Sequence, residues 1–230
     1  DARALAAEAV RQADTMDDGY SQATGYYYAS FVHAACGDTA RCFDTTQALV
    51  VVSREHGLEA LLVEAELLAA RALWERGRGG DRSTAMDTMR ALLPRIEGSG
   101  DLAFVLVYAA LVSEALLAEG AVDEALAVLR RAQQHARQGQ GLFLPEIHRL
   151  LAEVALVQGD TAWARLELNQ SLALADRQRS HSLALRAAVT GLRAGLPDAL
   201  NELHRRRGQV LGGADTRDVQ AAQESIRGMR

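Results

Sequence analysis

The chain has 230 residues, of which 49% are hydrophobic and 5% aromatic, and its formal net charge is −5 at pH 7. Every cationic side chain apart from histidine is an arginine, and an acidic balance without lysine argues against a surface that binds nucleic acid directly. Three prolines and the lack of alternating apolar and polar runs predict an all-α protein. The longest apolar run, Leu102–Val112, is too short to span a membrane, and no signal peptide opens the chain, so we expect a cytoplasmic protein.

Most of the chain is organised around glycines that recur at nearly constant spacing. A first amphipathic helix is expected over Ala2–Ala13, followed by a polar link at Asp17–Gly19. Turn glycines then stand at residues 37, 77, 120 and 159, in steps of 40, 43 and 39 residues. A period of this size is typical of stacked helical hairpins, so a helix pair is expected around each glycine.

The last part of the chain predicts one more hairpin and an extension. The fifth helix pair is expected over Ser182–Arg193 and Pro197–Arg207. Residues 208–230 then form a short C-terminal helical extension, with an amphipathic segment at Thr216–Ile226. The tight basic cluster at Arg205–Arg207 is interpreted as the solvated last turn of a helix, where the helix dipole favours positive charge.

The repeat is also visible in residue types. The tetrapeptide Gly-Asp-Thr-Ala occurs at Gly37–Ala40 and again at Gly159–Ala162, which suggests that Asp38 and Asp160 cap the helices that follow. Small residues stand seven positions before each turn glycine, as close helix packing requires: Ser30, Ala70, Ser113 and Ala152. We therefore expect residues 1–230 to form one tetratricopeptide-like repeat domain, a right-handed superhelical solenoid of about five hairpins. Because it starts at Asp1, inside a helix, we expect it to be a fragment of a larger protein.

The candidates for chemistry are weak. A zinc site could be imagined from His33, Cys36, Cys42 and His56, but the cysteine spacing is not that of a zinc finger or ribbon. Buried structural thiols are favoured instead, and a metal is rejected. His148 is interpreted as a structural histidine with satisfied hydrogen bonds. Without a phosphate-binding loop or a recognisable catalytic group, the chain is expected to be neither an enzyme nor a cofactor carrier.

The expected ligand or partner site is the concave face, which the first helix of each hairpin lines. Counting back from each turn glycine predicts an aromatic end and a charged stripe on this face. The predicted lining consists of Tyr27, Tyr28, Phe31, Arg71, Trp74, Glu114, Arg149 and Glu153. Glu114 and Glu153, 39 residues apart on adjacent units, are expected to face one another across the groove.

Two other interpretations of these residues remain open. The aromatic cluster around Tyr26–Phe31 could fill the core of the first hairpin or cover a seam with a preceding domain. The charged stripe could equally consist of salt bridges between repeats.

The second half of the chain resembles a family of large bacterial multidomain signalling ATPases of the STAND type, often described as adenylate-cyclase-like or winged-helix regulators. Three segments carry the resemblance, in the order of the family: Pro145–Leu156 followed by Gly159-Asp160, then Ser182–Ala188, then Gly213–Ala222. They are similar to its motifs Glu-Leu-His-Arg-Leu-x-Gly-Glu-Leu-Leu-Leu, Ser-Leu-Glu-Leu-Arg-Ala-Ala and Gly-Phe-Asp-Thr-x-Asp-Leu-x-x-Ala. Ala152 and Ala184 depart from it, where the family has Gly and Glu.

The resemblance implies a C-terminal sensor array that follows an output domain and a nucleotide-binding module of the same protein. An inducer or partner protein on the concave face would then bias that module between two states. The alternatives are a self-standing adaptor that grips a protein partner, and a homodimerisation module that uses Tyr26–Phe31 or Leu102–Val112 as an apolar patch. The ligand, the output domain and the oligomeric state do not follow from the sequence.

Overall fold

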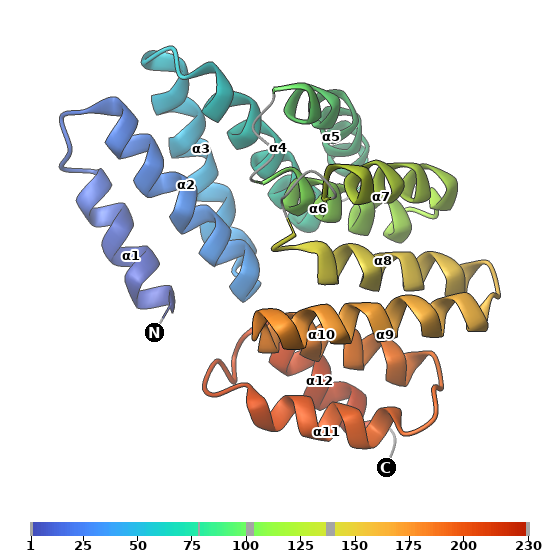
Figure 1. Ribbon diagram of the computed structural model, residues 1–230. Coiled ribbons are helices and arrows are strands. Elements are labelled where there is room, and N and C mark those ends of the chain that lie inside the picture. Colours follow the sequence, from blue (N-terminus) through green and yellow to red (C-terminus); the bar gives the residue numbers. More distant parts are fainter. Residues whose placement is uncertain (1, 78, 100–103, 137–140, 229–230) are drawn as a thin grey trace. The chain divides into compact units, whose positions relative to one another are not determined.

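The computed structural model describes residues 2–77, 79–99, 104–136 and 141–228. All regular elements within these ranges are α-helices, as the sequence predicts, and none is long and apolar enough to cross a membrane. The chain divides into two compact units, Asp1–Asp101 and Leu102–Arg230, each of which is described below by itself. The helices (Figure 1) are α1 Ala2–Ala13, α2 Gly19–Cys36, α3 Thr39–Glu55, α4 Glu59–Arg76, α5 Gly80–Gly98, α6 Val105–Ala118, α7 Val122–Ala136, α8 Leu144–Val157, α9 Thr161–Gln178, α10 His181–Arg193, α11 Ala199–Gln209 and α12 Arg217–Arg227.

In the first unit each helix packs on the next along the chain, from α1 to α5, and α2 also contacts α4. The contact between α1 and α2 is close because α2 contains Gly25. A Cβ atom at this position would lie 2.9 Å from the Cβ atom of Ala13, so only glycine lets the two helices approach this far.

In the second unit the first helices of successive hairpins touch one another. α6 contacts α8, α8 contacts α10, and α10 contacts α12, while α7, α9 and α11 pack against their neighbours along the chain. α8 is therefore surrounded by α6, α7, α9 and α10. Its sequence from Pro145 to Ala152 is continuously buried.

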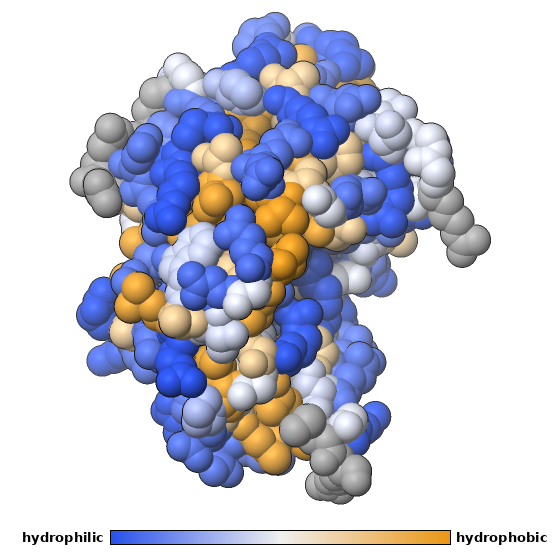
Figure 2. Space-filling view, turned by 90° about the vertical axis from the view of Figure 1, so that its right-hand side faces the viewer, coloured by the Kyte–Doolittle hydropathy of each residue, from blue (hydrophilic) through white to orange (hydrophobic). Residues whose placement is uncertain are grey.

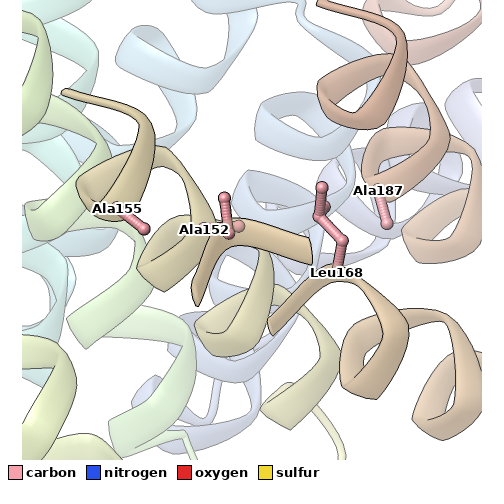
Figure 3. Packing of buried hydrophobic residues seen from close by; sticks show 5 residues of the cluster. Ala152, Ala155, Leu168 and Ala187 are labelled. Carbon is pink, nitrogen blue, oxygen red and sulfur yellow. The ribbon is translucent and has the colours of Figure 1, made fainter. Parts of the chain in front are cut away.

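Small residues make the packing between α8, α9 and α10 close. Ala152 and Ala155 of α8 meet Leu168 of α9 and Ala187 of α10 in one buried cluster (Figure 3), which also contains Ala164. The other small positions of the repeat pattern, Ser30, Ala70 and Ser113, are buried as well. Short side chains at these places let neighbouring helix backbones approach, as ridge-into-groove packing requires.

Three of the four turn glycines have the left-handed backbone that ends a helix. The φ angles are 74° at Gly37, 78° at Gly120 and 78° at Gly159. The capping prediction is also confirmed, because the Asp38 carboxylate accepts a hydrogen bond from the amide of Arg41 at 3.3 Å and Asp160 accepts one from that of Trp163 at 2.8 Å.

The turn at Gly77 is built differently. Gly77 has φ −73° and ψ 160°, and the left-handed residue of this turn is Gly79, with φ 57°. Gly77 is required for another reason: a Cβ atom there would lie 2.7 Å from the carbonyl oxygen of Leu73. The extra residues of this turn thus shift the left-handed position two residues along.

The C-terminal extension folds back on the second unit. α12 covers α10 and α11, with Val219 and Ala222 buried against Leu185 and Leu203. The predicted segment Thr216–Ile226 is confirmed within one residue at each end.

Candidate functional site

The eight predicted site residues fall into both units of the chain. Tyr27, Tyr28, Phe31, Arg71 and Trp74 belong to the first unit, and Glu114, Arg149 and Glu153 to the second. Because each unit is described by itself, the two sets form two separate candidate surfaces.

The aromatic residues of α2 form one cluster. The ring of Tyr27 packs edge-to-face on Tyr28 and on Phe31, with centroid distances of 5.4 Å and 4.9 Å. Tyr27 is buried, and its hydroxyl donates a 2.5 Å hydrogen bond to the Glu64 carboxylate on α4. Tyr28 is 54% exposed. Tyr27 therefore fills the core, as one of the interpretations left open by the sequence expects, whereas the ring of Tyr28 is exposed.

Arg71 and Trp74 form a buried group on α4. The guanidinium carbon of Arg71 lies 4.6 Å from the centroid of the Trp74 ring, and that of Arg82 lies 4.5 Å from it. Arg71 also donates a 2.7 Å hydrogen bond to Glu75, whose other carboxylate oxygen accepts one from Thr39. Both Arg71 and Trp74 are buried, so this group joins α3, α4 and α5 through cation–π and ionic contacts.

In the second unit, Arg149 is the centre of a network of ion pairs that we call the charged row. Arg149 makes two hydrogen bonds to Glu146, at 2.9 Å and 2.7 Å, and one to Glu153 at 3.0 Å. Glu114 on α6 lies 3.8 Å from it. Glu114 and Glu153 are thus linked through Arg149, and the predicted charged stripe takes the form of salt bridges between helices.

Four further residues of the charged row come from α10 and α12. Arg186 reaches Glu114 and Glu146 at 3.0 Å each and lies 3.7 Å from Asp218. Arg193 pairs with Glu153, and Thr190 donates a 3.0 Å hydrogen bond to that same carboxylate.

The sequence analysis did not find Glu146, Arg186, Arg193 or Asp218. A signal for most of them exists, because charges on α8 and α10 recur at spacings of three, four or seven residues and so share one helix face.

The charge of Arg149 is preserved although its side chain is buried. Burial alone would lower the pKa of Arg149, but the facing carboxylates, Glu146 foremost, raise it above its ordinary value. A buried ion pair contributes modestly to stability while intact, yet it is costly to break because one charge is then left uncompensated. The charged row therefore fixes the relative positions of α6, α8 and α10.

Among the histidine and cysteine candidates, His33, His148, Cys36 and Cys42 are buried, whereas His56 is exposed. Nδ1 of His148 lies 2.6 Å from the Glu167 carboxylate, which also accepts a hydrogen bond from the indole of Trp163. Cys36 and Cys42 are buried free thiols, and burial raises the pKa of Cys42 to about 12. A thiol with so high a pKa is neither a reactive nucleophile nor a ready metal ligand.

The two predicted apolar patches differ in exposure. Leu102 and Ala103 lie outside the described residues, but most of the remaining run to Val112 is buried in the core, so that stretch does not form an exposed patch. On α2 the exposed aromatic residues are Tyr20 and Tyr28. On the face drawn in Figure 2, hydrophobic residues reach the surface in patches between hydrophilic ones.

In comparisons with known proteins, no protein-family model matches the chain and no curated protein matches it. The features that bear on function are the charged row, the aromatic cluster and the arrangement of the helices.

Proposed function

We propose that this chain is a non-catalytic helical-repeat domain that binds a partner protein or a small-molecule inducer on the face formed by the first helices of its hairpins. In this proposal the helices form a right-handed superhelical solenoid of about five tetratricopeptide-like hairpins. The direct contacts of α6 with α8, α8 with α10 and α10 with α12 support such a stacking.

The observation that carries the proposal is the charged row. Within it Arg193 is 57% exposed, while Glu114, Glu153 and Arg186 are partly exposed and held in place by one another. Charged groups that neighbouring ion pairs hold in fixed positions offer a partner ready-made hydrogen-bond donors and acceptors. Binding to such a surface costs little side-chain entropy, which favours recognition.

The place of this domain in a larger protein is part of the same proposal. The similarity of Pro145–Ala222 to STAND-type ATPase regulators supports a C-terminal sensor array in a bacterial signalling or transcriptional regulator. Binding would favour one curvature of the array and so bias the neighbouring nucleotide-binding module, which requires different affinities for two states.

The proposal is tested by comparing how much partner or ligand co-purifies with the wild-type chain and with substituted chains. At equal expression, Arg193→Ala combined with Glu153→Gln should reduce the amount of the co-purified partner or ligand, quantified by mass spectrometry, by about tenfold or more. The matched control is Arg165→Ala, at an exposed position of α9 away from the charged row. Equal recovery with both variants would contradict the assignment of the surface.

A self-standing homodimer is the second candidate, and the exposed rings of Tyr20 and Tyr28 favour it. Measuring the mass of the isolated chain in solution distinguishes the two candidates. A dimer that Tyr28→Ser converts to a monomer would support the homodimer over the sensor domain.

A further inference from the structure

A cavity of about 350 Å³ lies between α9, α10 and α11, within the second unit. Its floor is made of the small α10 residues Ala187, Ala188 and Gly191. Leu168 and Leu172 of α9, with Leu196 before α11, form apolar walls. Leu168 and Ala187 also belong to the buried cluster shown in Figure 3, so the cavity adjoins the core. The volume falls within the lower part of the range of small-molecule pockets, about 300–1,000 Å³.

A Cβ atom fits above Gly191 without a steric clash. A Cβ atom at Gly191 would come no closer than 3.8 Å to Leu196 Cδ1 and 3.9 Å to Leu168 Cδ1, which is ordinary van der Waals contact. Glycine at this position thus leaves the space free, and a larger side chain would fill part of the cavity.

Polar groups stand at the edge of the cavity, and most of the charge there is already neutralised. Glu202 and Arg205 hydrogen-bond to each other at 2.7 Å, and Glu202 also accepts from Arg206 at 2.7 Å. The amides of Asn169 and Asn201 line the cavity without a hydrogen bond to other described residues. They are available as donors and acceptors to a ligand.

Asp198 is a charged residue at the cavity whose side chain does not cap its own helix. It stands at the N-cap of α11 with φ 57°, yet its side chain makes no capping hydrogen bond. By contrast, the N-cap residues Asp18, Asp38 and Asp160 each accept a hydrogen bond from a helix amide. An N-cap aspartate normally serves its helix. Asp198 instead lines the cavity as an exposed residue, and its carboxylate forms no ion pair with the other described residues.

We propose that this cavity is a binding site for a small molecule with an apolar body and a protonated amine. The body fills the space above Gly191, and the ammonium group pairs with Asp198, while Asn169 and Asn201 bond to further polar groups. Since Glu202 and Arg205 neutralise each other, Asp198 leaves the edge with a net negative charge, which selects a cation over an anion. The site shares no residue with the charged row. The inference therefore goes beyond the proposed function, and the two are tested independently of each other.

The test titrates n-hexylammonium and 2-phenylethylammonium into the whole 230-residue chain and follows the methyl NMR signals of Leu168, Leu172 and Leu196. Hexanoate has a body of similar size and the opposite charge. We expect saturable shifts with both amines, and at least about tenfold weaker binding of hexanoate.

Two substitutions separate the apolar body from the charge. Gly191→Leu should abolish the shifts, while Gly191→Ala, whose Cβ meets only ordinary contacts, should keep them. Asp198→Asn retains a residue that tolerates the left-handed backbone and should weaken amine binding by about tenfold, without changing the melting temperature by more than a few degrees. The absence of saturable shifts with either amine, equal binding of hexanoate, or unchanged amine binding by Asp198→Asn would each overturn the proposal.

Discussion

Arg149 is the residue through which three helices of the second unit are held together. Replacing it by Met keeps the apolar stem but leaves the Glu146 carboxylate, 2% exposed, with Arg186 as its remaining ion-pair partner. We expect Arg149→Met to lower the free energy of unfolding by about 3–5 kcal/mol, measured by urea denaturation at pH 7. Arg165→Met on the exposed side of α9 serves as the control and should change it by less than about 0.5 kcal/mol. Equal effects of the two variants would show that the charged row contributes no more than a surface charge.

Two carboxylates next to Arg206 predict how the stability of the second unit depends on pH. The hydrogen bond from Arg206 lowers the pKa of Asp176 below its ordinary 3.8. Burial would raise the pKa of Glu202, but hydrogen bonds from Arg205 and Arg206 lower it below its ordinary 4.5. A carboxylate with a lowered pKa in the folded state contributes stability above its unfolded pKa, and this contribution is lost as the pH falls through the folded pKa.

The melting temperature should therefore change little between pH 7 and pH 5 through these groups and fall below about pH 4.5. Arg206→Met removes the hydrogen bonds that lower the pKa of Asp176 and one of the two sources that lower that of Glu202, so its melting temperature should be lower at pH 7 and depend less steeply on pH in the acid range. Thermal unfolding by circular dichroism at pH 3–7 measures how steeply the melting temperature of the wild-type chain and of Arg206→Met depends on pH. Parallel slopes for the two proteins would contradict this explanation.

Among the helices, α1 and α8 represent two extremes of packing. α1 packs mainly on α2, and its buried residues are Ala6 and Ala13. α8 is surrounded by four helices of its own unit. Local opening is easiest where few apolar contacts are lost, so we expect amide hydrogens of α1 to exchange at least about 100-fold faster than those of α8. Hydrogen exchange read by mass spectrometry of peptides tests this, and equal protection of the two helices would contradict it.

The helices were predictable from the sequence because their signals are local. The turn glycines, the capping aspartates Asp38 and Asp160, and the bounds of α1 all depend on residues within one or two helical turns. The turn at Gly77 was the exception, because an insertion moved the left-handed position to Gly79.

The contacts of the candidate site were less predictable. The partner of Tyr27 is Glu64, 37 residues away, and that of Arg186 is Glu114, 72 residues away. Whether such groups meet depends on the rotation of each helix about its axis and on the choice of rotamer, which a spacing pattern does not specify. The pattern therefore placed Arg149 and Glu153 on one face but did not indicate that they are paired.

For the whole molecule, we propose binding as the activity. Its charged row is organised by ion pairs within the second unit, and its aromatic cluster is organised by ring contacts within the first. Among the histidine and cysteine candidates, Cys36 and Cys42 are buried, and His148 is buried and paired with Glu167. Binding is the activity that such surfaces support best.

Native mass spectrometry of the purified 230-residue chain, with and without its co-purified material, tests this central claim most directly. The account predicts a species heavier than the 24.8 kDa chain that carries a bound protein or a ligand of a few hundred daltons. It also predicts that Arg193→Ala combined with Glu153→Gln loses this added mass while Arg165→Ala keeps it. A chain that carries no bound species in any preparation, or one whose bound species persists in the double variant, would contradict the claim that the charged row is a recognition surface.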